Sequence, residues 1–324
     1  MTTLRKTITR TLAAALFVPV LGTAAFAQNL ALGTMGQGTS SYAAGAALSQ
    51  ILQQHTGRNT TVLPNSGETT ILPLVNNGEL DLGIASIMEV VQAVQGVGVF
   101  ENRPQEDILA LGVIHPLKVG IYVRADSDIE TVADLAGRRY TTGFTAMGTI
   151  DLVSQAILAS GGLTYNDVQQ VQVPNVVRGA DDFIAGRVDA FFFALGAAKV
   201  LEADASAGGL RLLPIDDSEE ARAAMAAVFP YGYLLEQPVT DGMAGMDAPQ
   251  NVFSYDNLLL INASVPDDQA RAITAALVEN VDAIRQNPQL RDFDPAAMYK
   301  IFPFEYHPGA VSYYEDQGIE QAAE

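Results

Sequence analysis

Glycine and hydroxyl residues gather in two loops, residues 33–41 and 141–149, and each loop leads into an expected helix. The start of a helix offers unpaired backbone N–H groups, and hydroxyls beside them can bind an anion such as a carboxylate. The same residues also serve as ordinary helix caps. Because two such loops facing each other across an open α/β structure form a small-molecule site, their pairing favours ligand contact over capping alone.

The sequence contains no phosphate-loop motif, no G-x-S-x-G nucleophile elbow and no H-E-x-x-H zinc motif. Its three histidines are His55, His115 and His307. His55 ends an expected helix and His307 precedes a proline, so both are expected in surface or capping roles, whereas His115 lies near an expected crossing between two halves. The absence of cysteine excludes disulfides, zinc–thiolate sites and iron–sulfur clusters. We therefore expect no catalytic residues, no metal and no cofactor.

The charge balance is strongly acidic, with 18 Lys+Arg against 37 Asp+Glu and a formal net charge of −19. Nucleic-acid binding needs clustered Lys and Arg, so the balance excludes that class, and it disfavours binding to anionic lipid. With 324 residues, 48% of them hydrophobic, the chain can form one large domain or two ordinary ones around a substantial core.

The first residues have the pattern of a secretory signal peptide. Arg5, Lys6 and Arg10 precede an apolar run over residues 12–20, and Ala25 and Ala27 supply the small residues of a cleavage site. A membrane anchor is the alternative, but the run is shorter than the roughly 20 residues of a spanning helix. We predict that residues 1–27 are a signal peptide that directs the protein to the periplasm.

Strand–loop–helix units recur along the remaining chain, which predicts an α/β fold of two similar halves with a mainly parallel sheet. Residues 204–250 give no secure assignment. Strands are expected at residues 29–32, 60–63, 81–85, 119–123, 139–142, 171–173, 188–193 and 251–262. Helices are expected at residues 42–54, 69–77, 127–136, 149–159, 181–185 and 267–286.

Four stretches resemble one known family. They are L-G-T-M-G-Q-G-T-S-S-Y at residues 32–42, G-E-L-D-L at 78–82, V-A-D-L-A-G-R-R at 132–139 and H-P-G-A-V-S-Y-Y at 307–314. The first and the last are the more specific. Together they resemble the TAXI family of solute-binding proteins, which serve TRAP-type tripartite transporters.

The resemblance covers nearly the whole chain after the signal peptide and implies a type II periplasmic binding protein. Such proteins have two Rossmann-like α/β lobes, a ligand cleft between them and hinge strands that cross twice. Residues 28–117 with 251–324 would form lobe I, and residues 118–250 would form lobe II. The implied function is capture of a small ligand by hinge closure and delivery to TRAP-type permease subunits, by a protein expected to be a monomer.

The sequence departs from the family at the implied site, where members commonly bind small carboxylates. Glu68 and Ile71 stand where the family has Ser and Asn, and residues 146–149 lack a glycine and a hydroxyl of the family motif. A buried Glu68 would repel a carboxylate and would suit a cationic or hydroxyl-bearing group. Alternatively, its side chain faces solvent.

Loop position and the resemblance together give a predicted set of ligand contacts, with Phe193 and Tyr231 as further candidates for an apolar wall. The predicted contacts are Thr34, Gly36, Thr39, Ser40, Tyr42, Ser66, Glu68, Thr69, Ser86, Thr142, Met147, Gly148, Thr149 and Leu195. The ligand is expected to be a small organic acid or an amino-acid-like molecule. The alternatives are an exported enzyme on the same scaffold and a ligand-sensing subunit of a receptor kinase.

Overall fold

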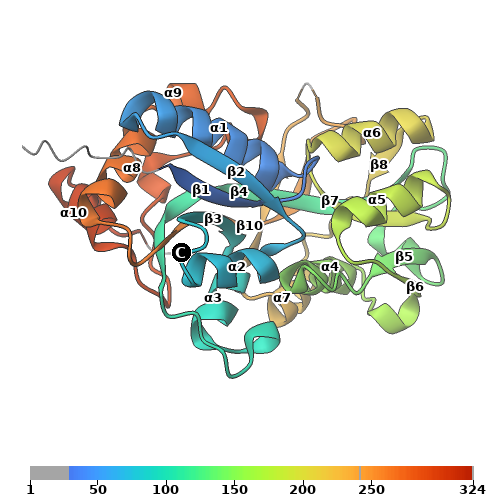
Figure 1. The fold of residues 1–324 in the computed structure, drawn as a ribbon. Helices are drawn as coiled ribbons and strands as arrows, with labels where there is room; N and C mark the ends of the chain where they lie inside the picture. The colour runs from blue at the N-terminus through green and yellow to red at the C-terminus, as the bar shows by residue number, and fades with distance from the viewer. Residues whose placement is uncertain (1–28, 241, 323–324) are drawn as a thin grey trace, which may run out of the picture.

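The computed structural model describes residues 29–240 and 242–322, so the predicted signal peptide lies outside the described residues. Ten strands of this part of the chain form one mixed sheet, with helices on both faces (Figure 1). The strands are β1 (Leu30–Met35), β2 (Thr60–Asn65), β3 (Leu82–Ser86), β4 (Ile108–Arg124), β5 (Arg139–Thr142), β6 (Gln169–Gln172), β7 (Ala190–Ala194), β8 (Leu210–Leu212), β9 (Gly232–Gln237) and β10 (Gln250–Asn262).

The helices alternate with the strands through most of the chain. The α-helices are α1 (Ser40–Thr56), α2 (Glu68–Asn76), α3 (Ile87–Gln95), α4 (Gly148–Ser160), α5 (Val176–Ile184), α6 (Ala198–Ala207), α7 (Glu219–Val228), α8 (Asp267–Glu279), α9 (Val281–Ile284) and α10 (Pro308–Asp316). Short 3-10 helices are η1 (Gly98–Phe100), η2 (Val132–Leu135), η3 (Tyr165–Asp167), η4 (Pro288–Leu290) and η5 (Pro295–Ala297). Within the described ranges, no helix is long and apolar enough to cross a membrane.

The strand order is β2-β1-β3-β10-β4-β7-β5-β6, with β8 beside β4 and β9 beside β10. Strands β1, β2 and β3 are parallel to one another, as are β5, β6 and β7. The expectation of a mainly parallel sheet is wrong at the centre, because β4 and β10 run antiparallel to every strand they pair with. Each half is thus a parallel α/β unit, and the two units meet at an antiparallel pair.

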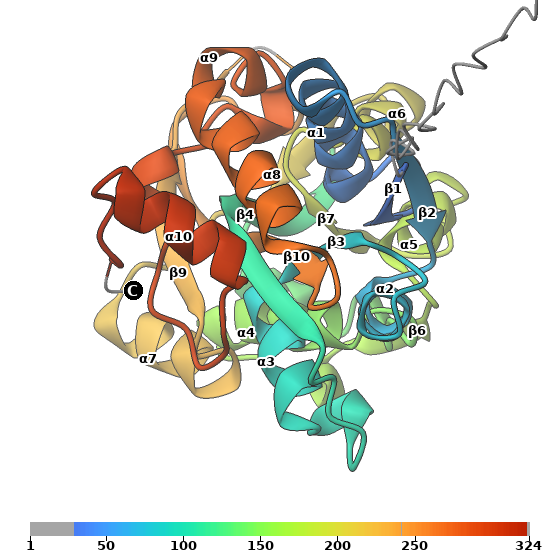
Figure 2. The ribbon, with the colours of Figure 1, turned by 60° about the vertical axis from the view of Figure 1, so that its left-hand side comes forward.

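Strands β4 and β10 are the long elements that join the halves. They pair from Ile108 opposite Asn262 to Val119 opposite Phe253, after which β4 continues beside β7. Figure 2 shows β4 passing beside β10 on its way between the halves. We call β1–β3 with α1–α3 and α8–α10 the first lobe, and β5–β8 with α4–α7 the second lobe.

Local sequence explains how the site-forming elements begin and end. Helix α1 starts after Thr39, whose hydroxyl accepts a hydrogen bond from the backbone N–H of Tyr42, and it ends at Gly57, whose φ of 69° is left-handed. Strand β10 is buried continuously from Val252 to Asn262, which agrees with its apolar sequence and its central place in the sheet.

The helix expected over residues 127–136 is reduced to the single turn η2. The Asp134 carboxylate accepts hydrogen bonds from the backbone N–H and the hydroxyl of Thr131, and Thr131 caps the turn in return. This capping box sets the start at Thr131 rather than at Ser127. Only one turn then fits before Gly137, whose φ of 72° ends the segment.

Candidate functional site

A groove of about 370 Å³ separates the two lobes on one side of the sheet. The first lobe contributes the loop before α1 and the end of β2, whereas the second contributes Met147 and the beginning of α5. The lining residues are Gly36, Gln37, Thr39, Asn65 and Ser66 from the first lobe, and Met147, Asn175, Val176, Val177, Arg178 and Asp181 from the second.

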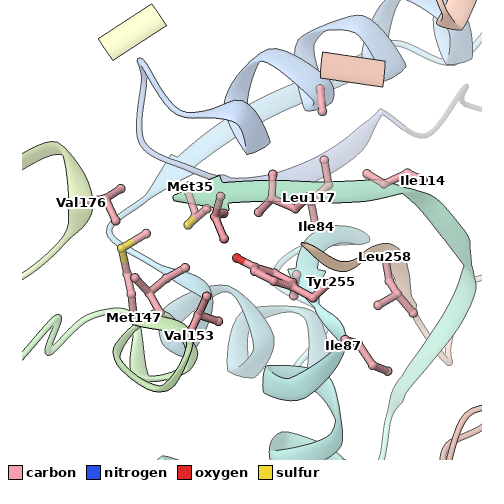
Figure 3. Close-up of a cluster of buried hydrophobic side chains, with 14 of the residues drawn as sticks. Met35, Ile84, Ile87, Ile114, Leu117, Met147, Val153, Val176, Tyr255 and Leu258 are labelled. Carbon is pink, nitrogen blue, oxygen red and sulfur yellow. The ribbon is translucent and has the colours of Figure 1, made fainter. Parts of the chain in front are cut away.

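A small apolar chamber adjoins this groove and shares Thr39, Met147 and Val176 with it. Its volume of about 20 Å³ corresponds to roughly one water molecule. Its other walls are Met35, Ser40, Leu117, Val119, Ile150, Phe192, Phe193, Ala194 and Tyr255, which come from both lobes and from the joining strands β4 and β10. Figure 3 shows Met35 and Met147 on opposite sides of this space, with Leu117 and Tyr255 beside it.

The lobes touch at several backbone positions around the groove. A Cβ atom placed on Gly67 would lie 1.8 Å from the carbonyl oxygen of Ala146, so glycine permits this close approach. On the other side of the groove, the backbone N–H of Lys199 donates to the carbonyl of Gly38 at 3.2 Å. These contacts describe a closed arrangement of the two lobes.

Glu68 is the first residue of α2, and its side chain is buried, with 2% of the residue exposed. Its Oε2 accepts hydrogen bonds from the backbone N–H of Ser86 at 3.1 Å and from the Ser86 hydroxyl at 2.7 Å. Its Oε1 has no hydrogen-bond partner among the described residues. Burial and the nearby charge of Glu89 raise the pKa of Glu68 to about 8, although the Ser86 hydrogen bonds oppose the shift.

Glu89 on α3 is fully buried and connects the two lobes. Its Oε1 accepts from the hydroxyl of Thr69 at 2.8 Å within the first lobe. Its Oε2 accepts from the backbone N–H of Thr149 at 2.9 Å and also from the Thr149 hydroxyl, in the first turn of α4 of the second lobe. Both oxygens are therefore satisfied, and two of the three hydrogen bonds cross between the lobes.

Tyr255 on β10 brings a second unsatisfied polar atom to the same region. The residue is fully buried, and its hydroxyl has no hydrogen-bond partner in the described part of the chain. Burial raises the pKa of Tyr255 well above its ordinary value, and the charges of Glu68 and Glu89 add to the effect. Figure 3 shows the phenol oxygen pointing toward Met35 and Met147, across the chamber.

Comparison with known proteins assigns this chain to a family. The sequence pattern of the NMT1-like family matches residues 32–318. The chain belongs to the NMT1-like family. The match covers both lobes and the two joining strands, so it includes every residue that lines the groove or the chamber.

Solved structures similar to this NMT1-like protein show its fold. PhnD1 from Prochlorococcus marinus, solved in complex with methylphosphonate, is 10% identical with a TM-score of 0.56, over 91% of this chain and 100% of the other. A structure described as a periplasmic transporter is 15% identical with a TM-score of 0.57, over 89% of this chain and 91% of the other. The predicted α/β fold, with two lobes in the type II periplasmic binding protein architecture, is confirmed.

The NMT1-like structure brings nine of the fourteen predicted contact residues together. Those that line the groove or the chamber are Gly36, Thr39, Ser40, Ser66 and Met147. Those that form the buried polar cluster around the two acids are Glu68, Thr69, Ser86 and Thr149. The burial of Glu68 excludes the alternative in which its side chain faces solvent.

The other five predicted residues are not among those lining either space. Thr34 packs against Gly45 of α1, and Gly148 faces Val99 of the first lobe. Tyr42 lies in the first turn of α1, and Leu195 lies near Gly120 of β4. Thr142 is buried at the end of β5, and its hydroxyl has no partner within the described ranges. Of the suggested wall residues, Phe193 lines the chamber, whereas Tyr231 lines a separate hollow.

Sequence reasoning missed Glu89 and Tyr255, which complete the cluster. Glu89 lies in the apolar segment Ile87–Gln95, where a lone acid among buried residues is a usable signal. Tyr255 lies in a strand whose sequence resembles ordinary core. Strand pairing brings it to the site, because it is opposite Leu117 of β4, which also lines the chamber.

The histidines lie outside this cluster. His307 is buried and caps α10, because its Nδ1 accepts from the backbone N–H of Gly309 at 3.1 Å and its Nε2 lies 2.9 Å from the carbonyl of Val265. The predicted capping role is confirmed. His55 is exposed at the end of α1. Burial lowers the pKa of His115 to about 4, and this residue lines a separate hollow of about 230 Å³.

Proposed function

We propose that this protein is an extracytoplasmic solute-binding protein that captures a small organic molecule between its lobes. The observation that carries the proposal is that both lobes wall the groove and the chamber, with Thr39 on one side and Met147 and Val176 on the other. A molecule bound there would contact both lobes at once. It would therefore stabilise the closed arrangement, which a membrane transporter could recognise.

The proposed partner is a TRAP-type permease, and the proposed location is the periplasm. The partner is supported by the resemblance of four sequence stretches to TAXI proteins, and the location by the signal-peptide pattern of residues 1–27. We further propose lobe boundaries at residues 117/118 and 250/251, which fall in or at the start of the joining strands β4 and β10. The protein is proposed to act as a monomer.

The proposed role is binding without turnover. The polar side chains of the cluster are bonded to one another: Glu68 to Ser86, and Glu89 to Thr69 and Thr149. Incubation of any ligand found with the protein, followed by NMR of the solution, should return the ligand unchanged. Conversion of the ligand would favour an exported enzyme instead.

Thermal unfolding of residues 28–324 tests the proposal. The protein is unfolded and refolded to remove bound ligand, and a dye reports unfolding because the chain has no tryptophan. The panel contains dicarboxylates, oxo- and hydroxy-acids, amino acids, amines and polyols. A compound at about 100 times its Kd should add roughly 2.7 kcal/mol and shift the Tm by several degrees.

A pair of variants locates the binding site. Met147→Arg places a long charged side chain where the groove meets the chamber and should abolish the shift. Ala133→Arg introduces the same charged side chain at an exposed position beside a different hollow of the second lobe and should leave the shift intact. If both variants still bind, the ligand lies elsewhere, and if no compound binds the parent protein, the proposed function fails.

A further inference from the structure

Taking the proposed function as its basis, we propose that the ligand carries a protonated amine, which binds between Glu68 and Tyr255, the tyrosine that lines the chamber. The apolar part of the same molecule would pack against Met35, Met147 and Phe193 as the chamber widens around it. The proposal thus assigns a substrate class to this site: amines with an apolar body.

The first support is a pair of buried acids without a compensating cation. Glu68 and Glu89 lie on consecutive helices and are both almost completely buried. Their hydrogen bonds in the described structure come from hydroxyl and backbone N–H groups of Thr69, Ser86 and Thr149, not from a lysine, arginine or histidine. A buried carboxyl is stable either protonated or paired with a cation, so a bound cation is the partner that would let Glu68 ionise beside Glu89.

The second support is the position of the unsatisfied atoms. Glu89 uses both of its oxygens, but Oε1 of Glu68 and the hydroxyl of Tyr255 have no partner among the residues that the structure describes. An ammonium group has three N–H donors. One can donate to Oε1 of Glu68 and another to the phenol oxygen of Tyr255, which faces the chamber (Figure 3).

Charge favours an amine over an acid at this position. A ligand carboxylate would join two buried acids and be repelled by Glu89, whereas an ammonium group is attracted by both. Because the pKa of Glu68 is raised to about 8 by burial and by Glu89, this carboxyl is mostly protonated at pH 7 in the free protein. Binding of the ammonium ion would ionise Glu68 and release its proton to the buffer, while the amine keeps its own proton.

The sign of the pH dependence follows from this exchange. Below pH 8 the free protein must lose a proton to bind, so affinity should rise about tenfold per pH unit and level off above pH 8. The alternative is a neutral Glu68 that donates its proton to an acceptor on the ligand. In that case affinity would be constant below pH 8 and would fall above it.

The experiment compares compounds that share one carbon frame and differ only in the end group. Hexylamine, hexanol and heptanoate form one set, and 2-phenylethylamine, 2-phenylethanol and 3-phenylpropionate form another. Thermal unfolding ranks them, and titration calorimetry of a binding amine in two buffers of different ionisation enthalpy counts the protons released. Because the pKa of Glu68 is raised above 7, binding at pH 7 should release most of one proton per amine bound.

The matched variants are Glu68→Gln and Glu79→Gln. Glutamine at position 68 keeps an oxygen for the Ser86 hydrogen bonds but cannot ionise, so amine affinity should fall at least tenfold and proton release should disappear. Glu79 is exposed, and its variant should bind like the parent protein. Circular dichroism of both variants confirms folding.

Each other outcome overturns the inference in a distinguishable way. If the alcohols or acids bind as well as the amines, or if Glu68→Gln binds amines normally, the assignment of an amine is wrong and the binding function stands. If none of the six compounds binds while a compound of the general panel without an amine does, the ligand class is wrong. If neither panel yields a ligand, the proposed function fails as well.

Discussion

The hydrogen bonds from Thr149 to Glu89 should control how readily the lobes close. Thr149→Val removes the hydroxyl, keeps the shape of the side chain and leaves the backbone N–H bonded to Glu89 at 2.9 Å. When the lobes separate, water can solvate Glu89 in place of the Thr149 hydroxyl. Loss of this hydrogen bond therefore destabilises mainly the closed arrangement. A hydrogen bond to a charged group contributes about 1.5–3 kcal/mol. A loss of about 2 kcal/mol corresponds to roughly 30-fold weaker closure.

The measurement uses the absence of cysteine from the chain. Cysteines introduced at the exposed positions Gln53 on α1 and Ser206 on α6 would be the only thiols, one on each lobe. Spin labels attached to these two cysteines report the distance between the lobes by pulsed electron paramagnetic resonance. Thr149→Val should move the distribution toward longer distances and raise the Kd of any closure-dependent ligand by roughly 30-fold.

The matched control is Thr145→Val, the same substitution at an exposed position four residues earlier. It should change neither the distance distribution nor the Kd. If Thr149→Val and Thr145→Val behave alike, Glu89 does not hold the lobes together, and the reasoning from its hydrogen bonds is wrong.

Three further substitutions have outcomes fixed by single contacts. Gly67→Ala should weaken ligand binding but leave the Tm of the unliganded protein nearly unchanged, because the added Cβ meets Ala146 only when the lobes close. His307→Ala should lower stability by about 2 kcal/mol in thermal unfolding, since it removes the cap of α10. Lys300→Met should cost about 3 kcal/mol, because it leaves buried Asp256 without its cation at 2.5 Å, and adding Asp256→Asn should recover part of that loss.

Elements with local sequence signals could be predicted. Helix α1 has a hydroxyl cap and a glycine stop, and β10 has a long apolar run, so both were expected within a few residues of their observed bounds. The expected helix over 127–136 was wrong because the Thr131–Asp134 capping box outweighs the apolar spacing. The unassigned segment 204–250 contains α7, whose Ser218 cap and following acids gave a usable signal.

The site residues that come from loops could be predicted from the sequence, whereas those that come from paired strands could not. The loops before α1 and α4 display their chemistry in the sequence, and Thr39 and Thr149 reach the site as expected. Tyr255 reaches it only because β10 pairs with β4 in one particular register. The joining strands also explain the error in sheet direction, because their antiparallel pairing depends on contacts over more than a hundred residues.

The two buried acids have different roles because their hydrogen bonds differ. Glu89 has both oxygens occupied and links the lobes, whereas Glu68 keeps one oxygen without a partner among the described residues, and its charge acts on Tyr255, whose hydroxyl also lacks a partner there. The charge of Glu89 raises the cost of ionising Glu68, so an ionised Glu68 disfavours the closed arrangement unless a cation accompanies it. A ligand that supplies this cation would satisfy Glu68 and allow Glu89 to hold the lobes closed. Recognition and closure would then depend on the same charge.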